Sequence, residues 1–187
     1  MDYALQTQVP MSSPDLTDAE RQAVQNVLNS PNLSMGPYIR RFEQAFCERT
    51  GLRHAIAVNS GTAGLHLCVR AAGIRPGDLV VTTPFSFVAS TNAILFEGGV
   101  PVYVDVDPLT GNPDPQALRA AVTDLLSGGA AAQKWLPPQG ASANAPLKAI
   151  LTVDVFGQPA DADPILEIAR AHGLRVIEDS CEALGAA

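Results

Sequence analysis

The chain has 187 residues, of which 47% are hydrophobic and 17% are charged, and this balance is typical of a globular protein rather than a disordered one. Twelve Lys and Arg residues against nineteen Asp and Glu residues give a net charge of −7, which argues against a general nucleic-acid binder but leaves room for a local phosphate site. No apolar run is long enough to span a membrane, the first five residues show no secretory signal, and the three cysteines are widely spaced, so we expect a cytoplasmic protein with reduced thiols.

The first fifty residues predict two amphipathic helices. Thr17 and Glu20 have the spacing of a capping box, which opens a helix with an apolar face at residues 23–28. A break at residues 30–37 separates it from a second helix, which ends near Gly51. We therefore expect residues 1–52 to form an N-terminal helical arm.

Short apolar segments alternate with helical patterns in the rest of the chain. The expected strands are residues 54–58, 79–82, 102–106, 149–155 and 175–177. The expected helices are residues 63–72, 88–96, 116–126 and 164–172. Because strands that alternate with helices form parallel sheets with helical crossovers, the pattern predicts an α/β fold.

Residues 127–146 interrupt this alternation. They are rich in Gly, Ala, Ser and Pro, which predicts a flexible surface loop. We expect the lone Trp135 to pin this loop to the body of the protein or to a partner.

The tetrad Asn59-Ser60-Gly61-Thr62 lies between the first expected strand and the helix that follows it. A helix start carries unpaired N–H groups and the positive end of the helix dipole, and glycine lets an anion approach the backbone closely. The tetrad therefore predicts a phosphate site, although an ordinary Ser or Thr helix cap explains the same residues.

Unusual segments also follow the other expected strands. Because ligands bind at the carboxyl ends of parallel strands, we expect these segments to meet at one site. The site would offer an anion cradle, an aromatic ring at Phe87 and a carboxylate at Asp179, a set that suits a flat heteroaromatic ring with a phosphate arm. Taken separately, Phe87 could be a core aromatic residue and Asp179 a solvated carboxylate in a turn.

Metal binding is not expected. The three histidines, His54, His66 and His172, lack metal-ligand spacing. The acidic run that begins at Asp105 and ends at Asn112 is better explained as a polar turn that leaves a strand than as a metal loop.

The motifs of residues 36–187 resemble the DegT/StrS family of nucleotide-sugar aminotransferases, which are fold-type-I enzymes that use pyridoxal 5'-phosphate. The resemblance depends on several motifs that occur in family order. They are Val58-Asn59-Ser60-Gly61-Thr62-Ala63, Arg75-Pro76-Gly77-Asp78, Thr83-Pro84-Phe85-Ser86-Phe87-Val88-Ala89, Pro101-Val102-Tyr103-Val104-Asp105-Val106, Gly157-Gln158-Pro159-Ala160-Asp161 and Glu178-Asp179.

The resemblance implies a fold and a set of cofactor contacts. The fold would be a three-layer sandwich with a mostly parallel sheet, in which residues 53–187 are an incomplete large domain and the family's small C-terminal domain is absent. Gly61 and Thr62, with Ser60, would hold the phosphate of pyridoxal 5'-phosphate. Phe87 would stack on the ring, Asp179 would meet the ring nitrogen, and Ser180 would assist near the cofactor.

The sequence departs from the family pattern at two positions and lacks one essential group. Asp154 stands where many members have histidine, and Glu182 stands where many have Gln or His. The resemblance places the Schiff-base lysine beyond Ala187, and the chain contains only Lys134, in the expected loop, and Lys148, at the start of a strand. We therefore expect no catalytic residue within these 187 residues and no transaminase activity from them alone.

The function implied by the resemblance is amino transfer from a donor such as glutamate to a keto group on a nucleotide-linked sugar. The family also implies a cytoplasmic homodimer, with no nucleic-acid or membrane partner. Two alternatives remain open: a sugar dehydratase of the same family that uses the aminated cofactor, and a non-catalytic binding or regulatory protein that retains the fold. A nicotinamide-binding domain is disfavoured because no Gly-x-Gly-x-x-Gly follows a strand.

Overall fold

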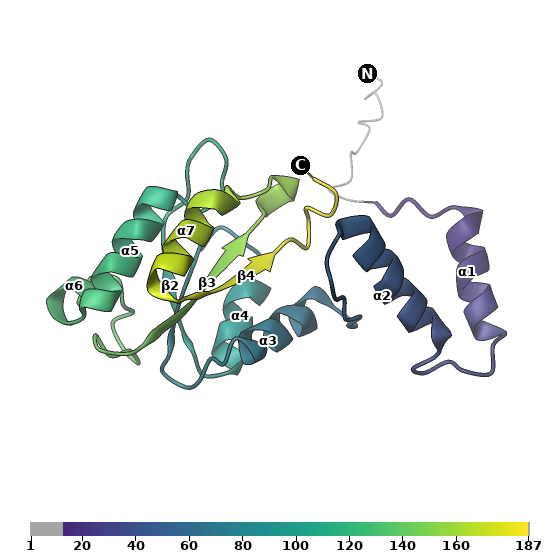
Figure 1. Cartoon of the computed structure of the whole chain (residues 1–187), viewed down its shortest axis with the longest axis horizontal. Helices are drawn as coiled ribbons and strands as arrows, with labels where there is room; N and C mark the ends of the chain where they lie inside the picture. Colours follow the sequence, from purple (N-terminus) through teal and green to yellow (C-terminus); the bar gives the residue numbers. More distant parts are fainter. Residues whose placement is uncertain (1–12, 187) are drawn as a thin grey trace, which may run out of the picture. The chain divides into compact units, whose positions relative to one another are not determined.

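The computed structural model describes residues 13–186, which form two compact units divided after Ala57 (Figure 1). The five N-terminal residues, where we expect no secretory signal, lie outside the described part of the chain. No helix in the described part is both long enough and apolar enough to cross a membrane.

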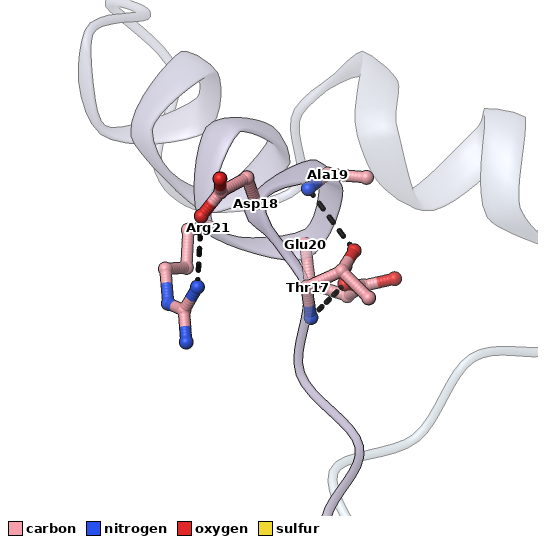
Figure 2. A network of polar contacts seen from close by, with 5 residues as sticks. All are labelled: Thr17, Asp18, Ala19, Glu20 and Arg21. Atoms are coloured by element: carbon pink, nitrogen blue, oxygen red, sulfur yellow. Dashed lines mark hydrogen bonds and ion pairs between the residues drawn. The ribbon is translucent and has the colours of Figure 1, made fainter.

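The first unit contains the two predicted helices, α1 (Asp18–Leu28) and α2 (Pro37–Thr50). The capping box is confirmed: the Thr17 side chain accepts a hydrogen bond from the N–H of Ala19 over 3.2 Å, and the Thr17 N–H donates to Oε2 of Glu20 over 2.7 Å (Figure 2). The hydrogen bond from the Thr17 side chain is the main cause that lowers the pKa of Glu20. The second helix ends at Gly51, whose φ of 72° is the left-handed conformation that glycine adopts without strain.

The second unit is built on a four-stranded parallel sheet in the order β2-β1-β3-β4. The strands are β1 (Leu79–Thr82), β2 (Val100–Tyr103), β3 (Leu147–Val153) and β4 (Arg175–Asp179). The helices are α3 (Gly61–Ala71), α4 (Val88–Phe96), α5 (Pro115–Ser127), α6 (Gly129–Gln133) and α7 (Ala162–His172), with a short 3-10 turn η1 (Val155–Gly157). The predicted α/β class is confirmed.

Helices cover both faces of this sheet, so the predicted three layers are present (Figure 1). On one face Leu79 and Val81 of β1 belong to a buried cluster with residues of α5 and α7. On the other face Val80 belongs to a cluster with residues of α3 and α4. Because successive side chains of a strand point to opposite faces, one apolar run supplies both layers of the core.

The expected strand at residues 54–58 is wrong. This segment pairs with no strand among the described residues, and Ile56 and Val58 are 80% and 44% exposed. The N–H of Ala57 donates instead to Oε1 of Glu43 on α2 over 2.9 Å. An apolar run becomes a strand only where a neighbouring strand completes its hydrogen bonds.

The expected flexible loop at residues 127–146 is also wrong in part. It contains α6, and Ala132 and Leu136 are buried in the core. The prediction for Trp135 is confirmed: its Nε1 donates to Oδ2 of Asp124 on α5 over 2.9 Å, so it fastens this segment to the body of the unit. The neighbouring Lys134 pairs with the same carboxylate over 2.8 Å, and its hydrogen bond is the main cause that lowers the pKa of Asp124.

The strand expected at residues 102–106 begins and ends earlier, at Val100 and Tyr103. The polar turn that follows it is confirmed. Oδ1 of Asp107 accepts hydrogen bonds from the N–H groups of Leu109 and Thr110 over 2.7 and 3.2 Å. This carboxylate organises a turn, as short polar side chains commonly do at strand ends.

Candidate functional site

A cavity of about 570 Å³ opens at the carboxyl end of the sheet in the second unit. It is lined by the start of α3, the loop between β1 and α4, the segment that follows β3 and the segment that follows β4. Four of the six predicted site residues line it: Gly61, Thr62, Phe87 and Asp179. The other two, Ser60 and Ser180, lie beside it and bond to protein groups instead.

The start of α3 combines a helix cap with free backbone donors. Ser60 is the N-cap residue, and its Oγ accepts a hydrogen bond from the N–H of Ala63 over 3.1 Å. Its carbonyl oxygen accepts from the N–H of Gly64 over 3.1 Å. The N–H groups of Gly61 and Thr62 precede the first intrahelical bond and so have no acceptor within the helix. The cap and the anion-site interpretations of the tetrad are therefore compatible.

Gly61 is required by a close approach. A Cβ atom at this position would lie 2.7 Å from Sγ of Cys181, which is shorter than any ordinary contact. The segment after β4 thus packs directly against the first turn of α3, and both border the cavity. A side chain at residue 61 would require the exposed Cys181 side chain or the segment that carries it to shift.

Asp179 is the last residue of β4 and is only 8% exposed. Its Oδ2 accepts a hydrogen bond from Oγ of Ser90 on α4 over 2.7 Å, and its Oδ1 accepts a longer one from the N–H of Cys181 over 3.4 Å. Oδ2 therefore has a good hydrogen bond to the protein, whereas the backbone bond to Oδ1 is weak. Ser90 was not predicted as a site residue, because its only signal in the sequence is a hydroxyl within the apolar run of α4.

Phe87 is the N-cap residue of α4, and its side chain is 79% exposed where it lines the cavity. It is therefore not a core aromatic residue. Its ring is free to contact a ligand.

Asp154, which lines the cavity, is hydrogen-bonded to the half-buried Ser180. Asp154 is 3% exposed, and its Oδ2 accepts a hydrogen bond from Oγ of Ser180 over 2.7 Å while its Oδ1 accepts one from the N–H of Ala160 over 2.9 Å. Asp154, which stands where many family members have histidine, thus links the end of β3 to the end of β4. The pKa of the adjacent Glu178 is raised, mainly by burial and also by the nearby Asp154 carboxylate. A hydrogen bond from Ser180 opposes this rise.

The segment after β3 carries a second aromatic wall in a strained conformation. Phe156 has a φ of 52°, a backbone conformation that residues other than glycine seldom adopt. Its ring packs edge to face against that of Phe85, with the ring centroids 5.8 Å apart. The N–H of Phe156 donates to Oε2 of Glu182 over 2.8 Å. Glu182 therefore stabilises the conformation of the cavity wall.

The side chain of Asn112 holds the same segment after β3 in place. This role was not predicted from the sequence, where the residue was interpreted only as part of a turn. The side chain is 4% exposed. Its Oδ1 accepts from the N–H of Val155 over 3.3 Å, and its Nδ2 donates to the carbonyl oxygens of Gln158 and Pro159 over 2.9 and 3.0 Å.

Neither lysine lines the cavity. Lys134 is held by Asp124, and Lys148 lies at the amino end of β3, six residues before Asp154. Because a strand rises about 3.3 Å per residue, Lys148 is roughly 20 Å from the carboxyl end of the sheet.

We predict that Gly61→Ala lowers the free energy of unfolding by about 1–3 kcal/mol, because the new methyl group overpacks the contact with Cys181. Urea denaturation measures the change. The double variant with Cys181→Ala should recover most of the loss. Gly64→Ala, on the same helix, is the matched control: its Cβ would lie 3.4 Å from Val58, so a change within about 1 kcal/mol is expected. Equal losses at both glycines would refute the steric explanation.

We also predict slow alkylation of Cys181. A hydrogen bond with Asp179, followed by burial and the charges of Asp179 and Glu182, raises the pKa of the thiol to about 11. On the order of 1% is then thiolate at pH 9, so the rate should still rise with pH above 10. Iodoacetamide labelling, resolved for each cysteine by mass spectrometry, measures this profile. Asp179→Asn should accelerate the reaction at pH 9, and an unchanged rate would contradict the assigned cause.

Three comparisons identify relatives of this chain. The model of the DegT/DnrJ/EryC1/StrS aminotransferase family matches residues 14–187. A GDP-perosamine synthase of Caulobacter vibrioides is 39% identical over 95% of this chain and 43% of the synthase.

Solved structures agree with this assignment. The aminotransferase from Psychrobacter cryohalolentis is 34% identical with a TM-score of 0.76, over 94% of this chain and 40% of that one. A GDP-4-keto-6-deoxymannose-3-dehydratase with a trapped PLP-glutamate geminal diamine is 28% identical with a TM-score of 0.80, over 96% of this chain and 43% of the other. The chain thus spans about two fifths of the length of the relatives it matches. The match over nearly all residues shows that this chain belongs to the DegT/DnrJ/EryC1/StrS aminotransferase family.

Proposed function

We propose that this chain forms the cofactor-binding part of a pyridoxal-phosphate-dependent aminotransferase that acts on a nucleotide-linked keto sugar. The observation that carries the proposal is the meeting of free backbone donors at Gly61 and Thr62, the exposed ring of Phe87 and the buried carboxylate of Asp179 around one cavity. Membership of the family supports the same assignment.

The residues present fit pyridoxal 5'-phosphate. The phosphate needs donors and positive potential, which the first turn of α3 supplies through the N–H groups of Gly61 and Thr62. The pyridine ring needs a flat apolar surface, and Phe87 offers one at the cavity. The ring nitrogen needs an acceptor, and Oδ1 of Asp179, whose hydrogen bond with the backbone N–H of Cys181 is long at 3.4 Å, would supply it. Ser60 and Ser180 would act indirectly, through the cap of α3 and through Asp154.

The bound cofactor supplies an electron sink for the carbon that exchanges the amino group. The protein contributes position and charge. Asp179 would hold a proton on the ring nitrogen, since an adjacent carboxylate favours the charged form of that ring. Phe87 would cover one face of the ring, and the donors of α3 would fix its phosphate end.

A lysine that binds the cofactor would come from outside these 187 residues. Lys134 is held by an ion pair on α5, and Lys148 lies at the opposite end of the sheet. The amino group would pass from glutamate to the sugar in a homodimer in the cytoplasm. The GDP-perosamine synthase supports a nucleotide-linked sugar as acceptor, and the trapped PLP-glutamate species supports glutamate as donor.

A sugar dehydratase of the same family is the second candidate. Of the two solved structures compared above, the dehydratase has the higher TM-score, 0.80 against 0.76. Glu182, which departs from the common Gln or His, also lines the cavity. A histidine at the position of the cofactor-binding lysine would favour the dehydratase, and a lysine there would favour the aminotransferase. A non-catalytic binding protein would have neither.

We predict that Asp179→Asn weakens the binding of pyridoxamine 5'-phosphate at least about tenfold, because the ring nitrogen loses its charged partner. Titration calorimetry on the 187-residue chain measures the affinity. Glu178→Gln is the matched control, since it makes the same charge change one residue earlier, on the other face of the sheet. Equal effects of the two variants would argue against the assigned role of Asp179.

The reaction itself is tested with the product of the complete reading frame that contains these residues. Incubation with glutamate and GDP-4-keto-6-deoxymannose should yield an amino sugar and 2-oxoglutarate, both measured by mass spectrometry. Loss of the sugar hydroxyl without transfer of nitrogen would replace the proposal with the dehydratase. No product from several nucleotide-linked keto sugars, together with no binding of cofactor, would refute both.

A further inference from the structure

Two serines form a hydroxyl chain that ends on the carboxylate of Asp179. Ser90, on α4, is fully buried, and its Oγ lies 2.7 Å from Oδ2 of Asp179, which is 89 residues away in sequence. The Oγ of Ser90 also lies 2.7 Å from Oγ of Ser86, in the loop that leads to Phe87. The chain thus joins the loop before α4 to the end of β4.

Proton counting gives this chain a direction. An ionised carboxylate only accepts hydrogen bonds, so the single proton of the Ser90 hydroxyl is donated to Asp179. Ser90 must then accept from Ser86, whose hydroxyl is the donor in the second bond. The carbonyl oxygen of Phe87, 3.1 Å from Oγ of Ser86, is the competing acceptor for that proton.

The chain also distinguishes the two oxygens of Asp179. Oδ2 is occupied by a short bond to a buried hydroxyl that has no access to solvent. Oδ1 has a long 3.4 Å contact with the N–H of Cys181, and the thiol of the same residue interacts with this carboxylate. A ligand in the cavity would therefore meet Oδ1.

We propose that Ser90, supported by Ser86, is the positioning residue that orients Asp179 toward the ring nitrogen of the cofactor. This inference rests on the proposed function. Ser90 does not line the cavity, so it acts through Asp179 and not on the ligand. A fully buried hydroxyl would otherwise cost free energy, and its bond to a carboxylate offsets that cost.

The proposal is tested with pyridoxamine 5'-phosphate labelled with ¹⁵N in the ring and bound to the 187-residue chain. Its ¹⁵N chemical shift reports whether the ring nitrogen carries a proton, and a pH titration gives the midpoint at which the proton is lost. In the unsubstituted protein this midpoint should lie above that of the free compound. Ser90→Ala should lower the midpoint toward that of the free compound and weaken binding about tenfold.

Two further variants separate orientation from packing. Thr91→Ala is the matched control, because it removes the next hydroxyl on α4, which bonds to Tyr103 and not to Asp179; neither the midpoint nor the affinity should change. Ser86→Ala removes a half-buried hydroxyl that, unlike that of Ser90, also lines the cavity. It carries little risk to folding and should shift the midpoint in the same direction as Ser90→Ala, but less.

Each outcome decides the matter. A lowered midpoint in both serine variants and not in Thr91→Ala supports the proposal. Binding with an unchanged midpoint in both serine variants overturns it, even if Ser90→Ala lowers the stability of the fold, and leaves the proposed function intact. If the unsubstituted 187-residue chain does not bind pyridoxamine 5'-phosphate, the same variants are measured in the product of the complete reading frame. No binding there refutes the cofactor site itself, and this inference with it.

Discussion

The register between β3 and β4 is the constraint on which the site depends. Val153 lies opposite Asp179, and the N–H of Asp154 donates to the carbonyl oxygen of Asp179 over 3.0 Å. This pairing ends both strands at the same level. A shift by one residue would turn the side chain of Asp179 to the opposite face of the sheet, away from Ser90 on α4. The position of the carboxylate is thus a property of the sheet and not of the loop that follows.

Asp154 and Asp179 are buried carboxylates at this end of the sheet, and hydrogen bonds from the protein stabilise both. The two differ in what they can still bind. Asp154 accepts two hydrogen bonds from the protein and ties β3 to the segments on either side. Asp179 accepts one short bond from Ser90 and one long bond from the N–H of Cys181. Because a buried charge without partners costs several kcal/mol, both carboxylates need these bonds. Asp154 accepts bonds of 2.9 and 2.7 Å on its two oxygens, whereas Oδ1 of Asp179 is held by a long backbone contact and can accept from a ligand. The first is suited to a structural role and the second to binding.

Local patterns in the sequence predicted much of the second unit. The periodicity of α7 depends on residues three and four apart, which are visible in the sequence, and the helix begins two residues before the expected start. The apolar run of α4, bounded by the Pro-Phe-Ser-Phe segment and Gly98, likewise placed that helix at residues 88–96. The strand predicted at residues 54–58 failed because its apolar run has no neighbour to pair with in the described residues. α6 was missed because five residues rich in alanine and glycine carry too little periodicity, and its helical state depends on packing against α5.

Some features of the candidate site could likewise be predicted from the sequence, and others could not. By itself the sequence determined the family, the order of the motifs, and the residue types at the end of each strand, because these follow from adjacent residues. The helix cap at Ser60 was also predicted, because it joins residues three apart. Only the tertiary structure decided that Gly61 and Thr62 face the cavity, that Ser180 turns to Asp154, and that Asn112 supports the wall of the cavity. The same is true of Ser90, which meets a carboxylate 89 residues away. Such contacts depend on the register of the sheet and the packing of α4 against it, and neither is encoded in any short stretch of the chain.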